Sequence, residues 1–275
     1  MSMFDEMSGF LLDLDGTVWR ELELIEGAAE SIQELQKAGK RVAALSNRGT
    51  HSRRQVASIL QEKGVDLDPK DIILTSHVAA EYLRKHHPGE AVWVLGESGL
   101  IEELQESGIP LAAHPEDAVW LVVSLHTGVT YHDLDQAFQA ATNGARVIAT
   151  NNDRAYPSSR GVSIDVAGML GAIEATTGKT PEIVVGKPSV HMFECAMDCL
   201  QGTVEKTMII GDSLGSDITL GKYGIKTALV LSGNTTLEMI SDAERTPDYV
   251  LHSIKDLIGT LKRDCISLES IKGDL

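Results

Sequence analysis

Phe10-Leu11-Leu12-Asp13-Leu14-Asp15-Gly16-Thr17 is an apolar run that ends in two carboxylates, a glycine and a hydroxyl. Short apolar runs closed by turn residues are typical of parallel strands buried on both faces, and open α/β sheets bind ligands at the carboxyl ends of such strands. Asp13 and Asp15 would repel each other and lose hydration there, which favours a site where a cation or a reaction compensates their charge. A strand followed by an ordinary Asp-Gly turn is the alternative interpretation.

Three later segments also place polar residues after apolar ones. Ser46 follows Arg41–Leu45, and Lys187 stands in Val184-Val185-Gly186-Lys187-Pro188. Asp212 and Asp217 both belong to Gly211-Asp212-Ser213-Leu214-Gly215-Ser216-Asp217, which follows the apolar run 208–210. Any one segment alone would be a weak signal, whereas four in order across nearly the whole chain are specific.

These segments resemble the four motifs of the haloacid dehalogenase superfamily of phosphohydrolases, in the order in which that family carries them. The resemblance implies an α/β fold, with a doubly wound parallel-sheet (Rossmann-like) core and an inserted α/β cap domain. It also implies an enzyme that hydrolyses phosphoric monoesters.

Length and charge narrow the class of protein further. The 275 residues, 43% of them hydrophobic, are enough for two domains with real cores. A formal net charge of -16 opposes binding to nucleic acid or to an anionic membrane. Because the same charge would repel a phosphorylated substrate, a phosphate site must build local positive potential from a metal, a lysine and backbone N–H groups.

A β-α-β unit is expected to follow the first strand. From Glu26 to Ala38, apolar residues recur at helical spacing, and Gly39 stands where a C-terminal cap would fall. The strand that ends in Ser46 comes next, and a right-handed crossover places two such strand ends side by side. We therefore expect Asp13 and Ser46 to meet.

Apolar spacing and capping signals predict the remaining elements. Strands are expected at 72–76, 91–95, 118–125, 145–150, 227–231 and 248–251, and a further strand should end at Asp212. Helices are expected at 52–63, from 76 to about 86, from 130 to about 142, from 189 to about 200, from Gly215 onward, and at 254–262.

The region from about 79 to 181 contributes none of the motif residues, so we interpret it as an inserted domain between core segments 1–78 and 182–275. An insertion of this length between the second and third motifs marks the large-cap class of the superfamily. Residues 144–151, 156–157, 178–179 and 186–189 resemble the NagD-like branch, which includes nitrophenyl and pyridoxal phosphatases. A cap that roofs the site implies a small phosphorylated metabolite as substrate, and the family resemblance allows a homo-oligomer.

The resemblance assigns catalytic roles to the first motif. It makes Asp13 the nucleophile that attacks phosphorus and forms an aspartyl-phosphate, and Asp15 the general acid and base. Relatives that break carbon–halogen bonds or pump ions usually lack an acid at the second position. Asp15 therefore favours phosphate-ester hydrolysis.

A magnesium ion belongs to the implied site as cofactor. Asp13, the backbone carbonyl of Asp15, and Asp212 would hold Mg²⁺ through hard oxygen ligands. Asp217 is expected in the first turn of the next helix, where it would orient a metal-bound water. A plain N-terminal helix acid is the alternative for Asp217.

Ser46, the Asn47 N–H and Lys187 would bind phosphate oxygens. The chain departs from the branch pattern at Arg48, where a second asparagine is usual, and at two serines, Ser213 and Ser216, of the fourth motif. Arg48 is expected either to bind a second anionic group of the substrate or to pair with an acid on the protein surface.

Three other functions stay open. A phosphotransferase or phosphomutase would pass the phosphoryl group from the same aspartyl-phosphate to a sugar hydroxyl. A receiver-like module would accept a phosphoryl group without being a general hydrolase, but it would occupy less than half of this chain and would not account for Gly16-Thr17 or for the cap. A doubly wound binding domain with incidental acids would turn over nothing.

The sequence also predicts the cellular compartment. Three cysteines give no disulfide framework, the N-terminal segment carries no basic n-region, and no apolar run reaches the length of a membrane span. We expect a cytoplasmic protein.

Overall fold

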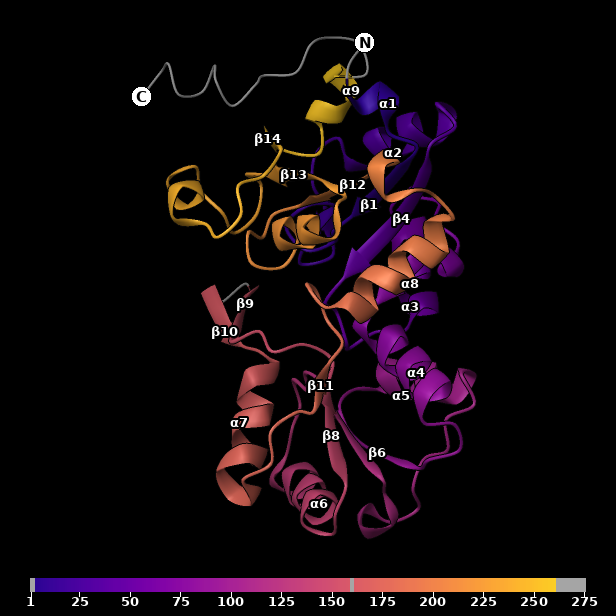
Figure 1. Cartoon of the computed structure of the whole chain (residues 1–275), viewed down its shortest axis with the longest axis vertical. Helices are drawn as coiled ribbons and strands as arrows, with labels where there is room; N and C mark the ends of the chain where they lie inside the picture. The colour runs from indigo at the N-terminus through magenta and orange to yellow at the C-terminus, as the bar shows by residue number, and fades with distance from the viewer. Residues whose placement is uncertain (1–2, 159–160, 261–275) are drawn as a thin grey trace. The chain divides into compact units, whose positions relative to one another are not determined.

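A six-stranded sheet carries the stretch 10–17 near its middle (Figure 1). The computed structural model describes residues 3–158 and 161–260, and the strand order of this sheet is β14-β13-β12-β1-β4-β5. Its strands are β1 (Gly9–Leu12), β4 (Arg41–Ser46), β5 (Ile72–Leu74), β12 (Thr207–Gly211), β13 (Lys226–Val230) and β14 (Tyr249–Leu251).

β1 pairs in parallel with β4 on one side and with β12 on the other, so that Leu12 lies opposite Ala44 and Ile210. All four residues of β1 are buried, as expected for a parallel strand covered on both faces. The predicted neighbourhood of the Asp13 and Ser46 strand ends is therefore confirmed, and the strand end before Asp212 joins them.

Short helices, 3₁₀ turns and one hairpin make up the rest of the segments that contribute to this sheet. The helices are α1 (Met3–Glu6), α2 (Ala28–Lys37), α3 (Arg53–Glu62), α8 (Val190–Leu200) and α9 (Asp256–Thr260). The 3₁₀ turns are η1 (Pro69–Asp71), η3 (Val204–Lys206), η4 (Ile218–Tyr223) and η5 (Glu238–Asp242). A small hairpin, β2 (Trp19–Arg20) with β3 (Glu23–Leu24), follows the first motif and was not predicted. The predicted end of the last helix, 261–262, lies outside the described residues.

Two details of the predicted helices are wrong. Ala38 is exposed beyond the end of α2, whose buried side chains include Ile32 and Leu35. No α-helix begins at Gly215: residues 214–217 form turns, and a 3₁₀ helix starts only at Ile218. The carboxylate of Asp217 bonds back to the Ser213 N–H at 3.0 Å, and the two glycines within and after η4 disfavour an α-helix.

A second sheet, of order β11-β8-β7-β6, is parallel throughout. Its strands are β6 (Val92–Leu95), β7 (Trp120–Val123), β8 (Arg146–Ala149) and β11 (Ile183–Val184). The associated elements are α4 (Thr75–His86), α5 (Ser98–Glu106), η2 (Pro115–Asp117), α6 (Tyr131–Thr142), the hairpin β9 (Ala155–Ser158) and β10 (Gly161–Ile164), and α7 (Val166–Thr177). Residues on one face, such as Leu121 and Val123, pack with α6 and α7, and the alternating Trp120 and Val122 are also fully buried.

The described chain forms two compact units. Unit 1 comprises the described residues within 1–46, 57–72 and 193–275, and unit 2 comprises those within 47–56 and 73–192. The predicted insertion, 79–181, falls wholly within unit 2, and its limits as a domain stay a prediction. The α/β class, with a parallel-sheet core and a further α/β part, is confirmed.

The predicted capping box at 52–55 and the predicted helix cap at Thr130 are both present in unit 2, and the cap at Thr130 is itself a capping box. Ser52 and Gln55 exchange backbone-to-side-chain hydrogen bonds at 3.0 and 3.2 Å, and Thr130 with Asp133 closes the start of α6 in the same way. Each box satisfies two N–H groups that a helix start would otherwise leave without partners. The helices therefore begin where these short sequences predict.

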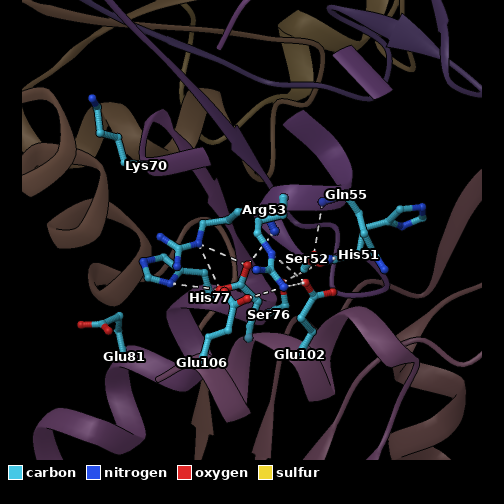
Figure 2. A network of polar contacts seen from close by, with 12 residues as sticks. His51, Ser52, Arg53, Gln55, Lys70, Ser76, His77, Glu81, Glu102 and Glu106 are labelled. Atoms are coloured by element: carbon cyan, nitrogen blue, oxygen red, sulfur yellow. Dashed lines mark hydrogen bonds and ion pairs between the residues drawn. The ribbon is translucent and has the colours of Figure 1, made fainter. Parts of the chain in front are cut away.

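A network of charged side chains fixes the start of α3 (Figure 2). The backbone N–H and the Nε of Arg53 donate to the buried carboxylate of Glu103 on α5, and His77 on α4 lies 3.5 Å from it. Arg54 pairs with Glu102 and Glu106 at 2.6 and 2.7 Å. Burial by itself would raise the pKa of Glu103, but the nearby His77 imidazole, the hydrogen bond from the Arg53 N–H and the charge of the Arg53 guanidinium lower it overall.

Among residues 3–158 and 161–260, no helix has the length and apolar character needed to cross a bilayer.

Candidate active site

Three carboxylates gather at the carboxyl ends of β1 and β12. Asp13, Asp212 and Asp217 are all buried, and each offers an oxygen within 4.8 Å of the oxygens of the other two. Carboxylates buried close together repel one another and lose hydration, which is unfavourable without a compensating positive charge. Clustered carboxylate oxygens are the hard ligands that Mg²⁺ prefers. The residues therefore fit a divalent cation.

Close backbone packing fixes the carboxylate of Asp212. Its Oδ2 accepts a hydrogen bond of 2.7 Å from the Asn234 N–H. A Cβ added at Gly233 would lie 1.9 Å from the same oxygen, and one at Gly16 would lie 2.4 Å from it. Gly16 also has φ +89°, which disfavours any other residue. The absence of a side chain at Gly16, in the first motif, thus leaves room for the carboxylate of Asp212, in the fourth motif.

Asp217 occupies the position before η4 and is fully buried. Besides the bond to the Ser213 N–H, its carboxylate packs so closely on Gly211 that a Cβ there would lie 2.2 Å from its Cγ. The structure brings Asp217 into the carboxylate cluster from a turn rather than from the first turn of a helix. Whether it orients a metal-bound water stays a prediction.

Asp15 is half-buried, and its side chain engages the hairpin that follows it. The Trp19 indole Nε1–H donates to Asp15 Oδ1 at 3.0 Å, and the Gly16 N–H donates to the Trp19 carbonyl at 2.8 Å. Trp19 is fully buried. Sequence reasoning missed this residue, although its place directly after the acids and the glycine was a signal for a contact with them.

The phosphate-binding candidates fall in both units. Ser46 is 2% exposed at the end of β4 in unit 1. Asn47, Arg48 and Lys187 belong to unit 2, where Lys187 is 6% exposed and the other two are half-buried. A lysine is seldom so buried without a specific reason. The Asn47 side chain also contacts Asp153, a residue that the sequence did not single out.

A parallel α/β sheet with clustered acids at its strand ends is an arrangement suited to binding a cation and to chemistry on a ligand at that edge of the sheet. Two family models match the chain, a haloacid dehalogenase-like hydrolase over residues 10–110 and a HAD-hydrolase-like family over residues 184–257.

Relatives and solved structures agree with these matches. Sugar-phosphatase AraL of Bacillus subtilis is 51% identical over 91% of this chain and 92% of its own length. 5'-nucleotidase YutF of the same organism is 30% identical, over 91% of this chain and 97% of its own. The p-nitrophenyl phosphatase from Archaeoglobus fulgidus superimposes with a TM-score of 0.86 at 32% identity, covering 92% of this chain and 98% of that chain.

The chain belongs to the haloacid dehalogenase-like hydrolases, and within them to the NagD-like phosphatases. The resemblance stated from the four motifs is confirmed, as is the prediction of a phosphatase. A receiver-like module and a non-catalytic binding domain are not supported by this membership.

Proposed function

We propose that the protein is a Mg²⁺-dependent phosphatase that hydrolyses a small phosphorylated metabolite through an aspartyl-phosphate on Asp13. The observation that carries the proposal is the buried cluster of Asp13, Asp212 and Asp217 at the carboxyl ends of two neighbouring strands. Such a cluster is costly unless a cation and a reaction make use of it.

The donor set supports magnesium as the cofactor. Asp13 and Asp212 would hold the ion together with the backbone carbonyl of Asp15, and Asp217 would orient a water bound to it. When bound, the ion neutralises charge on the phosphoryl oxygens and on the attacking carboxylate, which allows one anion to approach another.

Two displacements at phosphorus make up the proposed reaction. A carboxylate oxygen of Asp13 attacks the phosphorus, the bond to the ester oxygen breaks, and Asp15 gives its proton to the departing alkoxide. Asp15 then takes a proton from a water whose oxygen attacks the same phosphorus. This second displacement releases inorganic phosphate and restores the Asp13 carboxylate.

We propose that Ser46, the Asn47 backbone N–H and Lys187 bind the phosphoryl oxygens during both steps. Hydroxyl, amide and ammonium donors aimed at oxygens that gain negative charge are the usual means of lowering such a barrier. Arg48 keeps its two predicted roles, contact with a second anionic group of the substrate or an ion pair within the protein.

The substrate class proposed first is a sugar phosphate. The relationship to sugar-phosphatase AraL at 51% identity supports it, and the more distant relationship to 5'-nucleotidase YutF supports a nucleoside monophosphate as second candidate. A phosphotransferase that uses the same aspartyl-phosphate would reveal itself by a phosphorylated acceptor. Cytoplasmic location and a homo-oligomer stay predictions.

The proposal is tested with purified protein and Mg²⁺ against sugar phosphates, nucleoside monophosphates and p-nitrophenyl phosphate, with phosphate release as the readout. Asp13→Asn should abolish hydrolysis of all of them without unfolding the protein, because the amide is nearly isosteric with the carboxylate. Acid quenching during turnover should give a phosphorylated peptide containing Asp13 in the wild type alone. Retention of more than about one per cent of activity in the variant would refute the nucleophile.

A further inference from the structure

The side chain of Asn47 lies against the turn that carries Lys187. Asn47 Oδ1 accepts a hydrogen bond of 2.7 Å from the Lys187 backbone N–H. Asn47 Nδ2 donates to the Lys187 carbonyl at 3.4 Å and to Asp153 Oδ2 at 3.0 Å. All three residues belong to unit 2, and 140 positions separate Asn47 from Lys187. Both ends of the carboxamide are therefore engaged within the protein.

Two further contacts hold the backbone of Asn47 in place. Its carbonyl accepts from Thr75 Oγ1 at 3.0 Å and from Asn151 Nδ2 at 3.1 Å. Asn151 also accepts from the backbone N–H of Asp153 at 3.0 Å. Asn151 is 4% exposed and Thr75 is fully buried, so these bonds are largely shielded from water. The carboxamide thus projects from a fixed backbone toward the carboxylate of a residue whose own backbone is held by Asn151.

The turn before Lys187 is packed as tightly as the backbone of Asn47. A Cβ at Gly186 would lie 2.5 Å from the Thr150 carbonyl oxygen and 2.9 Å from Asn47 Oδ1. Such close approach leaves the turn little room to shift while the carboxamide stays in place. The position of the Lys187 backbone is consequently determined by Asn47 and by the chain segment 150–153.

We infer that Asn47 is a positioning residue for Lys187, and that Asp153 sets the orientation of its carboxamide. The inference rests on the proposed function, in which Lys187 binds the phosphoryl group, and it leaves the binding role of Asn47 to the backbone N–H alone. Asp153 dictates the orientation because a carboxylate accepts hydrogen bonds only, so the amide nitrogen faces it and the amide oxygen faces the Lys187 N–H.

An exchange of donor and acceptor tests this assignment. Asn47→Asp places a second carboxylate against Asp153, and the two repel each other. Asp153→Asn keeps an acceptor for Asn47 Nδ2. The double variant N47D/D153N reverses the pair, since the introduced carboxylate can accept from both the Lys187 N–H and the introduced amide, and the net charge equals that of the wild type. Asn152→Asp adds a charge at an exposed neighbour and serves as the control.

The readouts are kcat and KM for p-nitrophenyl phosphate, the inhibition constant of inorganic phosphate, and the unfolding temperature. N47D should lower kcat/KM about tenfold or more and weaken inhibition by phosphate, because a small misplacement of a phosphoryl-binding cation is costly. D153N and Asn152→Asp should each change kcat/KM by less than about threefold, and the double variant should recover to within about threefold of D153N.

Failure of the double variant to recover, although it unfolds at the temperature of D153N, would overturn the inference and make the Asn47 carboxamide a direct substrate contact. N47D with wild-type kinetics would overturn it as well. A wild-type protein that hydrolyses no phosphate ester would instead refute the proposed function, so the two failures are distinguishable.

Discussion

At the scale of single residues, the first motif does more than supply two acids. Gly16 approaches Asp212 closely, and Trp19 donates to Asp15. The sequence predicted Asp13 and Asp15 from charge and position. It did not predict the approach of Gly16 to Asp212, which joins distant parts of the chain, or the donation from Trp19 to Asp15, which depends on the hairpin that follows the first motif. Trp19 is the example that can be tested most directly.

Trp19→Phe should slow the hydrolysis of alkyl phosphates more than that of p-nitrophenyl phosphate. An indole N–H on Oδ1 directs the proton of Asp15 to its other oxygen, and only a poor leaving group needs that proton. We expect kcat for an alkyl ester to fall about tenfold, and that for the nitrophenyl ester by less than about threefold.

Trp120→Phe is the matched control for Trp19→Phe. Trp120 is equally buried and loses a comparable hydrogen bond, 2.7 Å to Glu90 Oε2, but it belongs to unit 2, whereas Asp13 and Asp15 belong to unit 1. The measurement is the steady-state kcat of both variants for the alkyl ester and for the nitrophenyl ester. Equal losses on the two esters in Trp19→Phe would mean that the indole only supports the fold.

At the scale of elements, the start of α3 depends on a buried charge. The side chain of Glu103 is 1% exposed and that of Arg53 is 22% exposed. A buried ion pair is costly to break from one side, because the remaining charge loses its partner. The sequence predicted the capping box of this helix, whereas the partner of Arg53, fifty positions away on α5, was not predicted.

Glu103→Gln should lower the free energy of unfolding at neutral pH by about 2 kcal/mol, since Arg53 keeps some contact with water. The pKa of Glu103 is lowered in the folded protein, so its stabilising contribution is present above the ordinary value of 4.5 and is lost as the pH falls through the lower folded value. Denaturant unfolding of the wild type and of Glu103→Gln, from neutral pH to below pH 4.5, measures the effect.

The difference in the free energy of unfolding between wild type and Glu103→Gln should be constant near neutral pH and shrink below pH 4.5. Glu102→Gln is the control, because its partner Arg54 is 64% exposed and such a pair contributes about 0–1 kcal/mol. A difference that stays unchanged down to the acid unfolding of the protein would contradict the role given to the Glu103 charge.

At the scale of the whole molecule, the proposed metal should couple activity to stability. A chelator should abolish hydrolysis and Mg²⁺ should restore it, whereas Ca²⁺ should bind and inhibit because its larger coordination sphere misplaces Asp13. Mg²⁺ at about 100 times its dissociation constant should raise the free energy of unfolding by about 2.7 kcal/mol.

Calorimetric unfolding with and without Mg²⁺ provides the measurement. Asp212→Asn should lose the stabilisation by Mg²⁺, while Asp198→Asn, at an exposed position on α8, should retain it. Full activity in chelator, or equal stabilisation of Asp212→Asn, would rule out this metal site.

The sequence by itself determined the parallel α/β class, the family and the positions of the motif acids, because apolar runs, turn residues and motif order are local properties of the chain. It also placed the capping box at 52–55 and the helix cap at Thr130, since each lies within four residues. Only the tertiary structure decided that Asp217 reaches the acid cluster from a turn, that Gly16 packs against Asp212, and that Asn47 holds the Lys187 turn. The last of these contacts joins residues 140 positions apart, and a contact of that kind exists only once the chain has folded and brought distant loops together.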